Sequence, residues 1–497
     1  MDMTQYKSNR RKHQKHGWRL DAIYEQCTMK YRLLVLLCLT CLCFTYLSIV
    51  VTPMPVLAAG KAHITLTPNM GPPTTQVTVQ GTGFHANQTV ALLFERQKIG
   101  TTMTDGSGTF STTFIVPSSA SPGSNQVEAR QGKLAAYTPF IVNTNWAMFG
   151  NDPQHSHENL YENRLNASNV SNLITDWTYT TRNVIWSSPA QVDGQVYFSS
   201  GSRLYAASAA TGYPLWTAHI GVTLYSSPAL AGGILYIGVG LQVDALSAAT
   251  GKVLWQASVN GSLGTEYSSP VVANGVVYIG SDDDKLYAFN AATGVLLWTA
   301  MTGGNLSSSP AYANGVVYIG SRDGRVYAFD ATTGASLWTV TIGGYFFASP
   351  AVANGMVYVS SYNESLVALS QQTGAVLWVA SIGQGNVAFS SPAVAGGIVY
   401  VGAGKDVEAF DASSGIPVWT ATTGNFVFSS PAVANGVVYV GSDDEKVYAF
   451  DAGTGTTLWV GITGSTIESS PAVANGVVYI GSDDDKLYAY HLPGTSP

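Results

Sequence analysis

The sequence predicts an all-β protein: an eight-bladed β-propeller with four-stranded blades, preceded by a small β-sandwich and an N-terminal apolar helix. Three observations lead to this fold. A Ser-Pro pair recurs eight times at intervals of 39 to 42 residues, seven copies close with a Trp four residues after a Thr-Gly or Ser-Gly pair, and nineteen uncharged residues run together near the N-terminus. Only 11% of the residues are charged and 52 are glycine, which favours strands and turns over helices.

The first 59 residues predict export. Residues 1–32 form a basic n-region with eight Lys and Arg against three acidic residues, and we expect it to stay in the cytoplasm. Residues 33–59 form a signal peptide or membrane anchor: the run from Leu33 to Val51 is near the length that spans a bilayer, and Val56-Leu-Ala fits a signal-peptidase site. Both alternatives place the rest of the chain outside the cytoplasm, secreted or membrane-anchored with the N-terminus inside.

The exported part is acidic and free of cysteine. Removing the n-region from the totals of 23 basic and 30 acidic residues leaves 15 and 27, a net charge of about −12. This charge excludes nucleic acid as an expected partner, because phosphate binding needs a basic surface. The four cysteines end at Cys43, so the exported part has no disulfide, thiol nucleophile or thiolate metal site, whereas carboxylates remain possible metal ligands.

Residues 60–143 predict the β-sandwich. Segments such as Ile64-Thr-Leu-Thr and Phe110-Ser-Thr-Thr-Phe alternate apolar and polar residues, and turn clusters such as Asp105-Gly-Ser-Gly separate them. The opening Ile64-Thr-Leu-Thr-Pro-Asn-Met-Gly-Pro-Pro and the later Gly81-Thr-Gly-Phe resemble the immunoglobulin-like IPT/TIG modules of exported bacterial proteins. The resemblance implies a spacer or adhesive unit.

Residues 174–491 contain the repeat that predicts the propeller. Most Ser-Pro pairs are followed by a hairpin turn, a Val-Val-Tyr-Ile-like run, a second turn and a Leu-Tyr-Ala-Phe-like run, so we expect each copy to form a four-stranded sheet. Eight such sheets bury their faces when they are arranged around an axis. The prolines of the eight pairs are Pro189, Pro228, Pro270, Pro310, Pro350, Pro392, Pro431 and Pro471.

The two ends of the repeat predict how the ring closes. The eighth copy stops at Tyr490 and His491 without its Trp strand, whereas such a strand, Ile174-Thr-Asp-Trp-Thr-Tyr, precedes the first copy. We therefore expect these ends to form one blade, with residues 144–173 as a lead-in segment and residues 492–497 as a tail. The eight repeat tryptophans are interpreted as structural residues between blades: Trp177, Trp216, Trp255, Trp298, Trp338, Trp378, Trp419 and Trp459.

The landmarks Ser-Pro-Ala-Val, Gly-Ser-Asp-Asp-Asp-Lys-Leu-Tyr-Ala-Phe and Thr-Gly-X-X-X-Trp resemble the PQQ-repeat propellers, and Trp146-Ala-Met-Phe-Gly-Asn-Asp resembles the segment before their first blade. This family includes quinoprotein alcohol and glucose dehydrogenases and non-catalytic members such as the outer-membrane assembly lipoprotein. In the dehydrogenases, the resemblance implies PQQ held between a Trp and a vicinal Cys-Cys disulfide, beside calcium and a carboxylate base. This chain lacks those cysteines and the long insertions that build the enzymes' pocket, so we expect no cofactor.

The function predicted is therefore non-catalytic: an exported binding or scaffold protein whose partner is another exported protein or a cell-envelope component, with membrane contact through residues 33–59 if these are retained. Two alternatives stay open, a PQQ-dependent dehydrogenase with calcium and an extracytoplasmic sensor of a small ligand. The acidic runs are interpreted as solvated turns and not as calcium ligands. These runs begin at Asp282, Asp443 and Asp483.

The candidate binding face lies where the chain crosses from one blade to the next. Because strands alternate in direction, we expect the residue three positions before each Ser-Pro proline at one mouth of the central channel. This mouth is on the face that carries the acidic hairpins, and the repeated Asn-Gly turns lie on the opposite face. Mostly aromatic residues at an exposed mouth would form a binding surface, and the alternative is that they fill the spaces between blades. The residues are Trp186, Tyr225, Tyr267, Ser307, Phe347, Phe389, Phe428 and Glu468.

Overall fold

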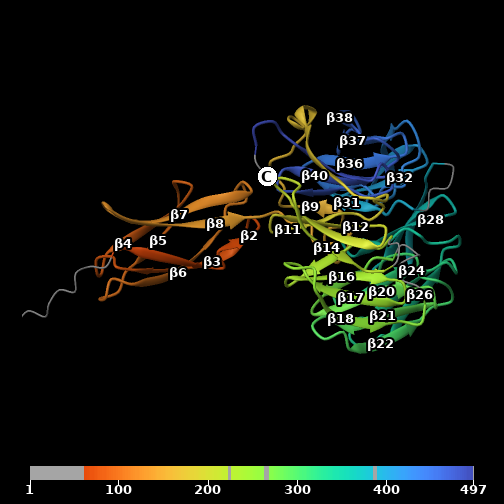
Figure 1. The fold of residues 1–497 in the computed structure, drawn as a ribbon, viewed down its shortest axis with the longest axis horizontal. Helices are drawn as coiled ribbons and strands as arrows, with labels where there is room; N and C mark the ends of the chain where they lie inside the picture. Colours follow the sequence, from red (N-terminus) through yellow and green to blue (C-terminus); the bar gives the residue numbers. More distant parts are fainter. Residues whose placement is uncertain (1–60, 222–224, 262–267, 384–388, 496–497) are drawn as a thin grey trace, which may run out of the picture. The chain divides into compact units, whose positions relative to one another are not determined.

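The structure is a computed structural model and describes residues 61–221, 225–261, 268–383 and 389–495 (Figure 1). The predicted N-terminal helix and the export segment, residues 1–59, lie outside the described residues. Within the described ranges, no helix is long and apolar enough to cross a membrane.

The part of the chain before the propeller is a β-sandwich. Its core includes Val77, Val90 and Phe140, each fully buried between the two sheets. These alternate with exposed neighbours, because successive side chains of a strand point to opposite faces. One sheet has the order β1 (His63–Thr67), β3 (Gln76–Thr82), β6 (Phe110–Ile115), and the other the order β2 (Met70–Gly71), β8 (Leu134–Val142), β7 (Gly123–Gln131), β4 (Thr89–Phe94), β5 (Gln97–Met103).

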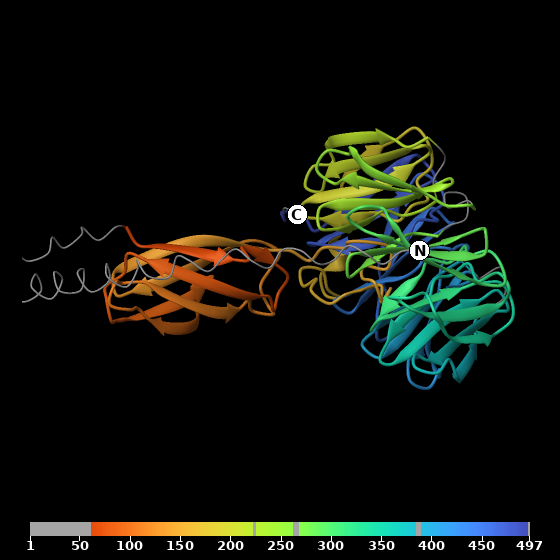
Figure 2. The same cartoon turned by 90° about the horizontal axis from the view of Figure 1, so that it is seen from below.

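Eight blades of four antiparallel strands follow, the seventh extended by a short parallel fifth strand, and the prediction of eight blades is confirmed (Figures 1 and 2). From the inner to the outer strand, the first four blades are β11 (Ala190–Val192), β12 (Gln195–Ser200), β13 (Arg203–Ser208), β14 (Pro214–His219); β15 (Ala229–Ala231), β16 (Ile234–Val239), β17 (Gln242–Ser247), β18 (Val253–Ser258); β19 (Val271–Ala273), β20 (Val276–Ser281), β21 (Lys285–Asn290), β22 (Leu296–Met301); and β23 (Ala311–Ala313), β24 (Val316–Gly320), β25 (Arg325–Asp330), β26 (Ser336–Thr341).

Blades 5 to 8 repeat this order, and the last takes its outer strand from the start of the repeat. They are β27 (Ala351–Ala353), β28 (Met356–Ser361), β29 (Ser365–Ser370), β30 (Val376–Ser381); β31 (Ala393–Ala395), β32 (Ile398–Ala403), β33 (Asp406–Asp411), β34 (Pro417–Thr422); β35 (Ala432–Ala434), β36 (Val437–Ser442), β37 (Lys446–Asp451), β38 (Thr457–Ile462); and β39 (Ala472–Ala474), β40 (Val477–Ser482), β41 (Lys486–His491), β10 (Ile174–Thr180).

Two-residue turns connect the inner strand of most blades to the next strand. In blade 3, Asn274 and Gly275 have φ values of +49° and +76°. Positive φ at both positions is the geometry of the turn whose twist matches an antiparallel hairpin, and Asn-Gly is the pair that adopts it with least strain. The repeated Asn-Gly pairs therefore set the register of the inner hairpins.

The ring closes as the two ends of the repeat predict. Strand β10 pairs antiparallel with β41, from Ile174 opposite His491 to Thr180 opposite Lys486. The imidazole Nε2 of His491 also lies 3.3 Å from a carboxylate oxygen of Asp176. The eighth blade thus has four strands, and no edge of β41 is left open.

The repeat tryptophans lie at the junctions between blades. Each indole Nε1 donates a hydrogen bond of 2.7–3.1 Å to a backbone carbonyl of the following blade or, for Trp459, to that of Leu173 just before β10. This placement supports a structural role. The donor and acceptor residues are Trp177 and Ala209, Trp216 and Ala248, Trp255 and Ala291, Trp298 and Ala331, Trp338 and Gln371, Trp378 and Ala412, Trp419 and Ala452, and Trp459 and Leu173.

The lead-in segment bonds to the inner edges of the blades. It contains β9 (Glu158–Asn159), which pairs parallel with β35, and a short 3₁₀ helix, η1 (Val170–Asn172). In six inner strands, the backbone N–H of the middle residue donates to a backbone carbonyl of the lead-in segment at 2.6–2.9 Å. The segment therefore pairs strand edges that would otherwise be free. The donors are Gln191, Leu230, Tyr312, Val352, Val394 and Val433, and the acceptors are Trp146, Ala147, Pro153, Gln154, Ser156 and His157.

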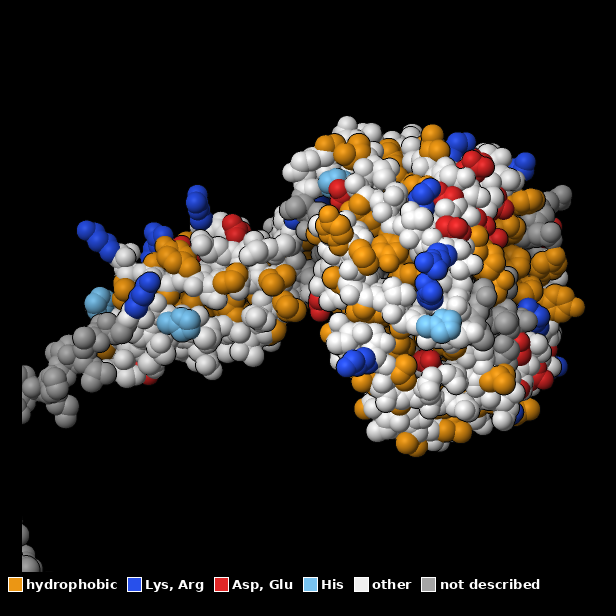
Figure 3. Space-filling model, viewed as in Figure 1, with side chains coloured by type: hydrophobic (Ala, Val, Ile, Leu, Met, Phe, Trp, Pro, Cys, Tyr) orange, Lys and Arg blue, Asp and Glu red, His pale blue; other side chains and the backbone are white. Residues whose placement is uncertain are grey.

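The outer strands expose many apolar side chains, among them Leu254 and Leu297. Figure 3 shows hydrophobic side chains scattered among polar atoms over the viewed face of the propeller. Apolar residues dispersed in this way are normal on a protein surface.

Candidate binding site in the central channel

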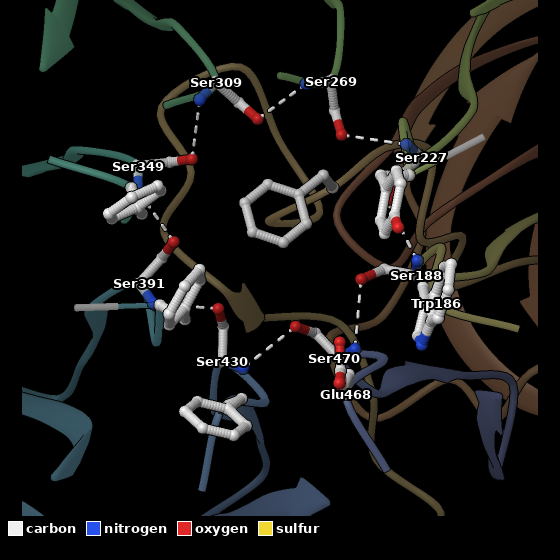
Figure 4. Close-up of a pocket in the computed structure, with 15 residues that line it drawn as sticks. Trp186, Ser188, Ser227, Ser269, Ser309, Ser349, Ser391, Ser430, Glu468 and Ser470 are labelled. Atoms are coloured by element: carbon white, nitrogen blue, oxygen red, sulfur yellow. Dashed lines mark hydrogen bonds between the residues drawn. The ribbon is translucent and has the colours of Figure 1, made fainter. Parts of the chain in front are cut away.

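One end of the central channel contains a cavity of about 310 Å³. This volume is at the lower end of the range of roughly 300–1,000 Å³ found for small-molecule sites. All eight blades contribute to its lining, together with Phe149 from the lead-in segment (Figure 4).

Six of the eight residues predicted for the mouth line this cavity, and each is half-buried. The prediction differs from the structure at Ser307, which is only 1% exposed and is not part of the lining. Tyr267 lies outside the described residues. The six are Trp186, Tyr225, Phe347, Phe389, Phe428 and Glu468.

The side chains that fill the spaces between blades come one position earlier in the chain. Leu306, Phe346 and Ile467 have no exposed surface, and Ile185 and Val427 occupy equivalent buried positions. Leu306 packs with residues of blades 3 and 4 in one core cluster. These neighbours fill the spaces between blades, and the mouth residues both line the cavity and contact one another across blade boundaries.

A closed ring of serines lies beneath the aromatic residues. The backbone N–H of each serine donates to the hydroxyl oxygen of the serine in the next blade, at 2.8–3.1 Å, and the last bond joins blade 8 to blade 1 (Figure 4). Every one of these hydroxyls lines the cavity. They belong to Ser188, Ser227, Ser269, Ser309, Ser349, Ser391, Ser430 and Ser470.

Two buried histidines pack against Phe149. His155 and His157 meet its ring edge-to-face, at centroid distances of 5.4 and 5.0 Å. Both imidazoles are almost completely buried, and this burial lowers the pKa of each to about 3. Both are therefore neutral at physiological pH and serve as apolar packing for Phe149.

The aromatic residues of the lining form two groups. Trp186 and Tyr225 stack with ring centroids 4.5 Å apart and planes inclined by 4°. Phe389 stacks on Phe347 at 4.8 Å and meets Phe428 edge-to-face at 5.4 Å. These rings pack against each other across blade boundaries, so their orientation is fixed before any ligand enters.

Acidic residues gather on the side formed by blades 7 and 8. Burial, reinforced by the negative charges of Asp483 and Asp443, raises the pKa of Glu468 to about 7. Burial likewise raises the pKa of Asp443 to about 6 and raises that of Asp483, although Thr466 Oγ1 donates to Asp483 at 2.9 Å. We call Asp443, Glu468 and Asp483 the acidic corner.

The acidic hairpins differ in the use of their successive carboxylates. The middle aspartates are engaged locally: Asp283, for example, accepts from Lys285 Nζ at 2.7 Å and from the Tyr287 hydroxyl at 2.6 Å. Asp444 and Asp484 make equivalent bonds. The first aspartates, Asp443 and Asp483, form no such ion pair and belong to the acidic corner. Treating each run as one solvated turn missed this distinction.

Sequence reasoning also missed the serine ring and Phe149. The signal for the ring was present, because the residue before all eight prolines is serine. The signal for Phe149 was its place in Trp146-Ala-Met-Phe, but nothing in that motif indicates contact with the channel. Sequence reasoning also missed Arg322, whose guanidinium lies 4.7 Å from the ring centroid of Phe347. Arg322 follows Ser321 and so occupies the position in its hairpin that Asp443, after Ser442, occupies in blade 7.

A family model described as outer membrane protein assembly factor BamB matches residues 158–295, 282–393 and 383–494, which together cover more than half of the chain. A comparison with curated proteins finds no match.

Three of the solved structures that share the fold illustrate the similarity. The quinohemoprotein alcohol dehydrogenase from Comamonas testosteroni has a TM-score of 0.64 and 16% identity over 71% of this chain and 81% of that chain. A europium-containing methanol dehydrogenase has a TM-score of 0.61 and 15% identity over 70% and 98% of the two chains. BamB from Moraxella catarrhalis has a TM-score of 0.56 and 18% identity over 65% and 99%. Such identities show the fold alone. The family match confirms the resemblance over the repeat, and the chain belongs to the PQQ-repeat β-propeller family described by the BamB model.

Proposed function

We propose that this chain is an exported binding protein without catalytic activity of its own, and that the channel cavity is its binding site. The observation that carries the proposal is the lining: half-buried aromatic side chains from five blades converge there above a ring of serines that is the same in every blade. Aromatic anchors in a preformed, partly desolvated pocket tend to supply a large share of binding energy. The residues at this position also vary between blades, which gives an asymmetric ligand a unique orientation.

The non-catalytic alternative is favoured over a quinoprotein enzyme by the charge of the cavity. PQQ carries three carboxylates, so a site for it needs cationic groups. Among the described residues that line the cavity, Glu468 is the charged one, and none is Lys or Arg. The cysteines needed for a disulfide platform are also missing, because all four lie at or before Cys43. The residues of the cavity therefore do not fit the cofactor.

Export and the domain boundaries belong to the same proposal. The basic residues 1–32 and the apolar residues 33–59 support a cytoplasmic N-terminus with the propeller outside, and the β-sandwich acts as an IPT/TIG-like spacer between membrane and propeller. A second exported protein or an envelope component fits such a protein as its partner. A reporter fused after Pro497 should be active only outside the membrane, and activity in the cytoplasm would contradict the proposal.

The binding site is tested by replacing Trp186, Tyr225 and Phe428 together by Ala. The triple variant should lose the ligands or envelope partners that native mass spectrometry and crosslinking detect on the wild-type protein, while its thermal unfolding midpoint stays close to that of the wild type. A variant with Leu254 and Leu297 replaced by Ala is the control, because these side chains are exposed on outer strands. Unfolding of the triple variant would show that the aromatic residues are core, and PQQ-dependent oxidation of alcohols or sugars would overturn the non-catalytic assignment.

A further inference from the structure

We propose that the channel cavity binds an organic ammonium cation, with the alkylated nitrogen against the aromatic rings and its charge balanced by Glu468. This inference rests on the proposed function, since it assigns the ligand class of the same site. It follows from three properties of the cavity, which are the kind of rings in its walls, the sign of its charge and the size of the space.

The walls supply the surface that such a cation prefers. The face of an aromatic ring is electronegative and attracts a cation held within about 6 Å of the centroid, most strongly when the ring is Trp. Trp186 and Tyr225 are stacked on one side of the cavity, and Phe347, Phe389 and Phe428 form the other group. The guanidinium of Arg322 lies 4.7 Å from the ring centroid of Phe347, so one ring of this wall already interacts with a cation.

The acidic corner supplies the charge. Asp443, Glu468 and Asp483 take part in none of the ion pairs found in the described part of the chain, and one carboxylate oxygen each of Asp443 and Asp483 is buried without a hydrogen-bond partner. The three carboxylates therefore repel one another without a compensating cation. A positively charged ligand relieves this repulsion, whereas an anion adds to it.

The geometry favours an organic cation over a metal ion. No group of three or more metal-ligating side chains in the described ranges is placed to hold a metal. The cavity of about 310 Å³ is also much larger than one ion and is lined mainly by aromatic rings and neutral hydroxyls. A bulky, weakly hydrated ammonium group fills apolar space and carries charge at once, which is the combination that the lining offers.

The test compares choline with 3,3-dimethylbutan-1-ol, which has the same shape but a carbon in place of the nitrogen. Isothermal titration calorimetry on the full-length protein should detect choline binding at least ten-fold tighter than binding of the neutral alcohol. Glu468→Gln should weaken choline binding about ten-fold and leave the neutral alcohol unaffected. Glu445→Gln is the matched control, because Glu445 is an exposed carboxylate of a hairpin next to the acidic corner and its replacement removes the same charge.

The pH dependence gives an independent readout. The pKa of Glu468 is raised to about 7, so its carboxylate is charged above pH 7 and becomes neutral as the pH falls below it. Choline binding should therefore weaken between pH 8 and pH 6 in the wild type. The charges of Asp443 and Asp483 act on Glu468, and burial raises the pKa of Asp443 to about 6, so Glu468→Gln should keep only a smaller pH dependence at the acidic end.

The outcomes separate this inference from the proposed function. Equal binding of choline and the neutral alcohol, or no binding of choline up to about 10 mM, a limit for weak ligands, overturns the cation assignment. If a neutral or anionic ligand then binds and the triple Ala variant loses it, the cavity is still the binding site and only the ligand class was wrong. If binding of every ligand survives in the folded triple variant, both proposals fail.

Discussion

The contact between Trp298 and the turn at Gly334 provides a quantitative test of how the blades are joined. Trp298 lies on β22, the outer strand of blade 3, and its Nε1 donates to the carbonyl of Ala331 in blade 4 at 3.0 Å. The turn of blade 4 then passes over the indole at Gly334, which has a φ of +71°. A Cβ at Gly334 would lie 2.6 Å from Cε3 of Trp298, closer than side-chain carbons approach each other.

Gly334→Ala should destabilise the propeller by about 2–5 kcal/mol, of which about 1–2 kcal/mol arises from the left-handed backbone and about 1–3 kcal/mol from the clash with the indole. Gly315→Ala in the same blade separates the two contributions. Gly315 has a φ of +83°, but no atom lies within 4 Å of the position of its Cβ, so its replacement carries the backbone contribution alone.

The double variant with Trp298→Ala completes the cycle. Without the indole, Gly334→Ala should cost only the backbone contribution, so the two substitutions should couple by about 1–3 kcal/mol. Urea unfolding followed by circular dichroism gives the free energies. If Gly334→Ala costs no more than Gly315→Ala, or costs the same with and without Trp298, then the indole is not a fixed contact between blades and the structural interpretation of the eight tryptophans fails.

Three further predictions concern closure, the serine ring and the buried histidines. Deleting residues 172–181 should lower the melting temperature of the propeller, since it leaves the edge of β41 unpaired, and an unchanged melting curve would contradict closure by β10. Ser309→Ala leaves the N–H of Ser269 without its acceptor and should lower the free energy of unfolding by about 1–3 kcal/mol, as measured with urea. Ser336→Ala is the control and should have no effect, because Ser336 is exposed. Burial lowers the pKa of His155 from 6.5 to about 3, so its contribution to stability is complete above pH 6.5 and is lost as the pH falls toward 3. The stability advantage of the wild type over His155→Gln should therefore shrink by about 2 kcal/mol between pH 7 and pH 5, and a constant difference would show that folding does not change the pKa of His155.

The blades and their closure could be predicted because their determinants are local and repeated. Ser-Pro, Asn-Gly and the Thr-Gly-X-X-X-Trp spacing each fix a turn or a strand end within one copy, and eight copies reinforce the same assignment. Closure of the ring could be predicted because the last copy lacks its Trp strand after Tyr490, whereas such a strand, with Trp177, precedes the first copy. This prediction compares copies of the repeat and needs no knowledge of contacts. Strand direction alone predicted the six mouth residues that line the cavity. Ser307 is buried and does not line it, and Tyr267 lies outside the described residues.

The lead-in contacts and the acidic corner could not be predicted in the same way. The lead-in segment bonds to the blades through backbone carbonyls such as that of Pro153, and a backbone acceptor leaves no mark on residue type. The acidic corner joins Asp443 of one hairpin, Asp483 of the next and Glu468 from the crossover between them. Their proximity depends on the angle between neighbouring blades, whereas the sequence presents two of them as members of ordinary turns.

The division between constant and variable positions explains how one repeat can serve both folding and recognition. The serine before each proline is the same in all eight blades because the hydrogen-bonded ring needs a hydroxyl from each one, and a single replacement leaves one donor unpaired. Two positions earlier, the side chain lines the cavity and belongs to no ring of hydrogen bonds that needs the same group from every blade. Trp186, Phe389 and Glu468 can therefore occupy equivalent places in the same fold. A ligand without eightfold symmetry is oriented only by such differences, so the position of Glu468 between Asp443 and Asp483 decides on which side of the cavity a positive charge is most stable.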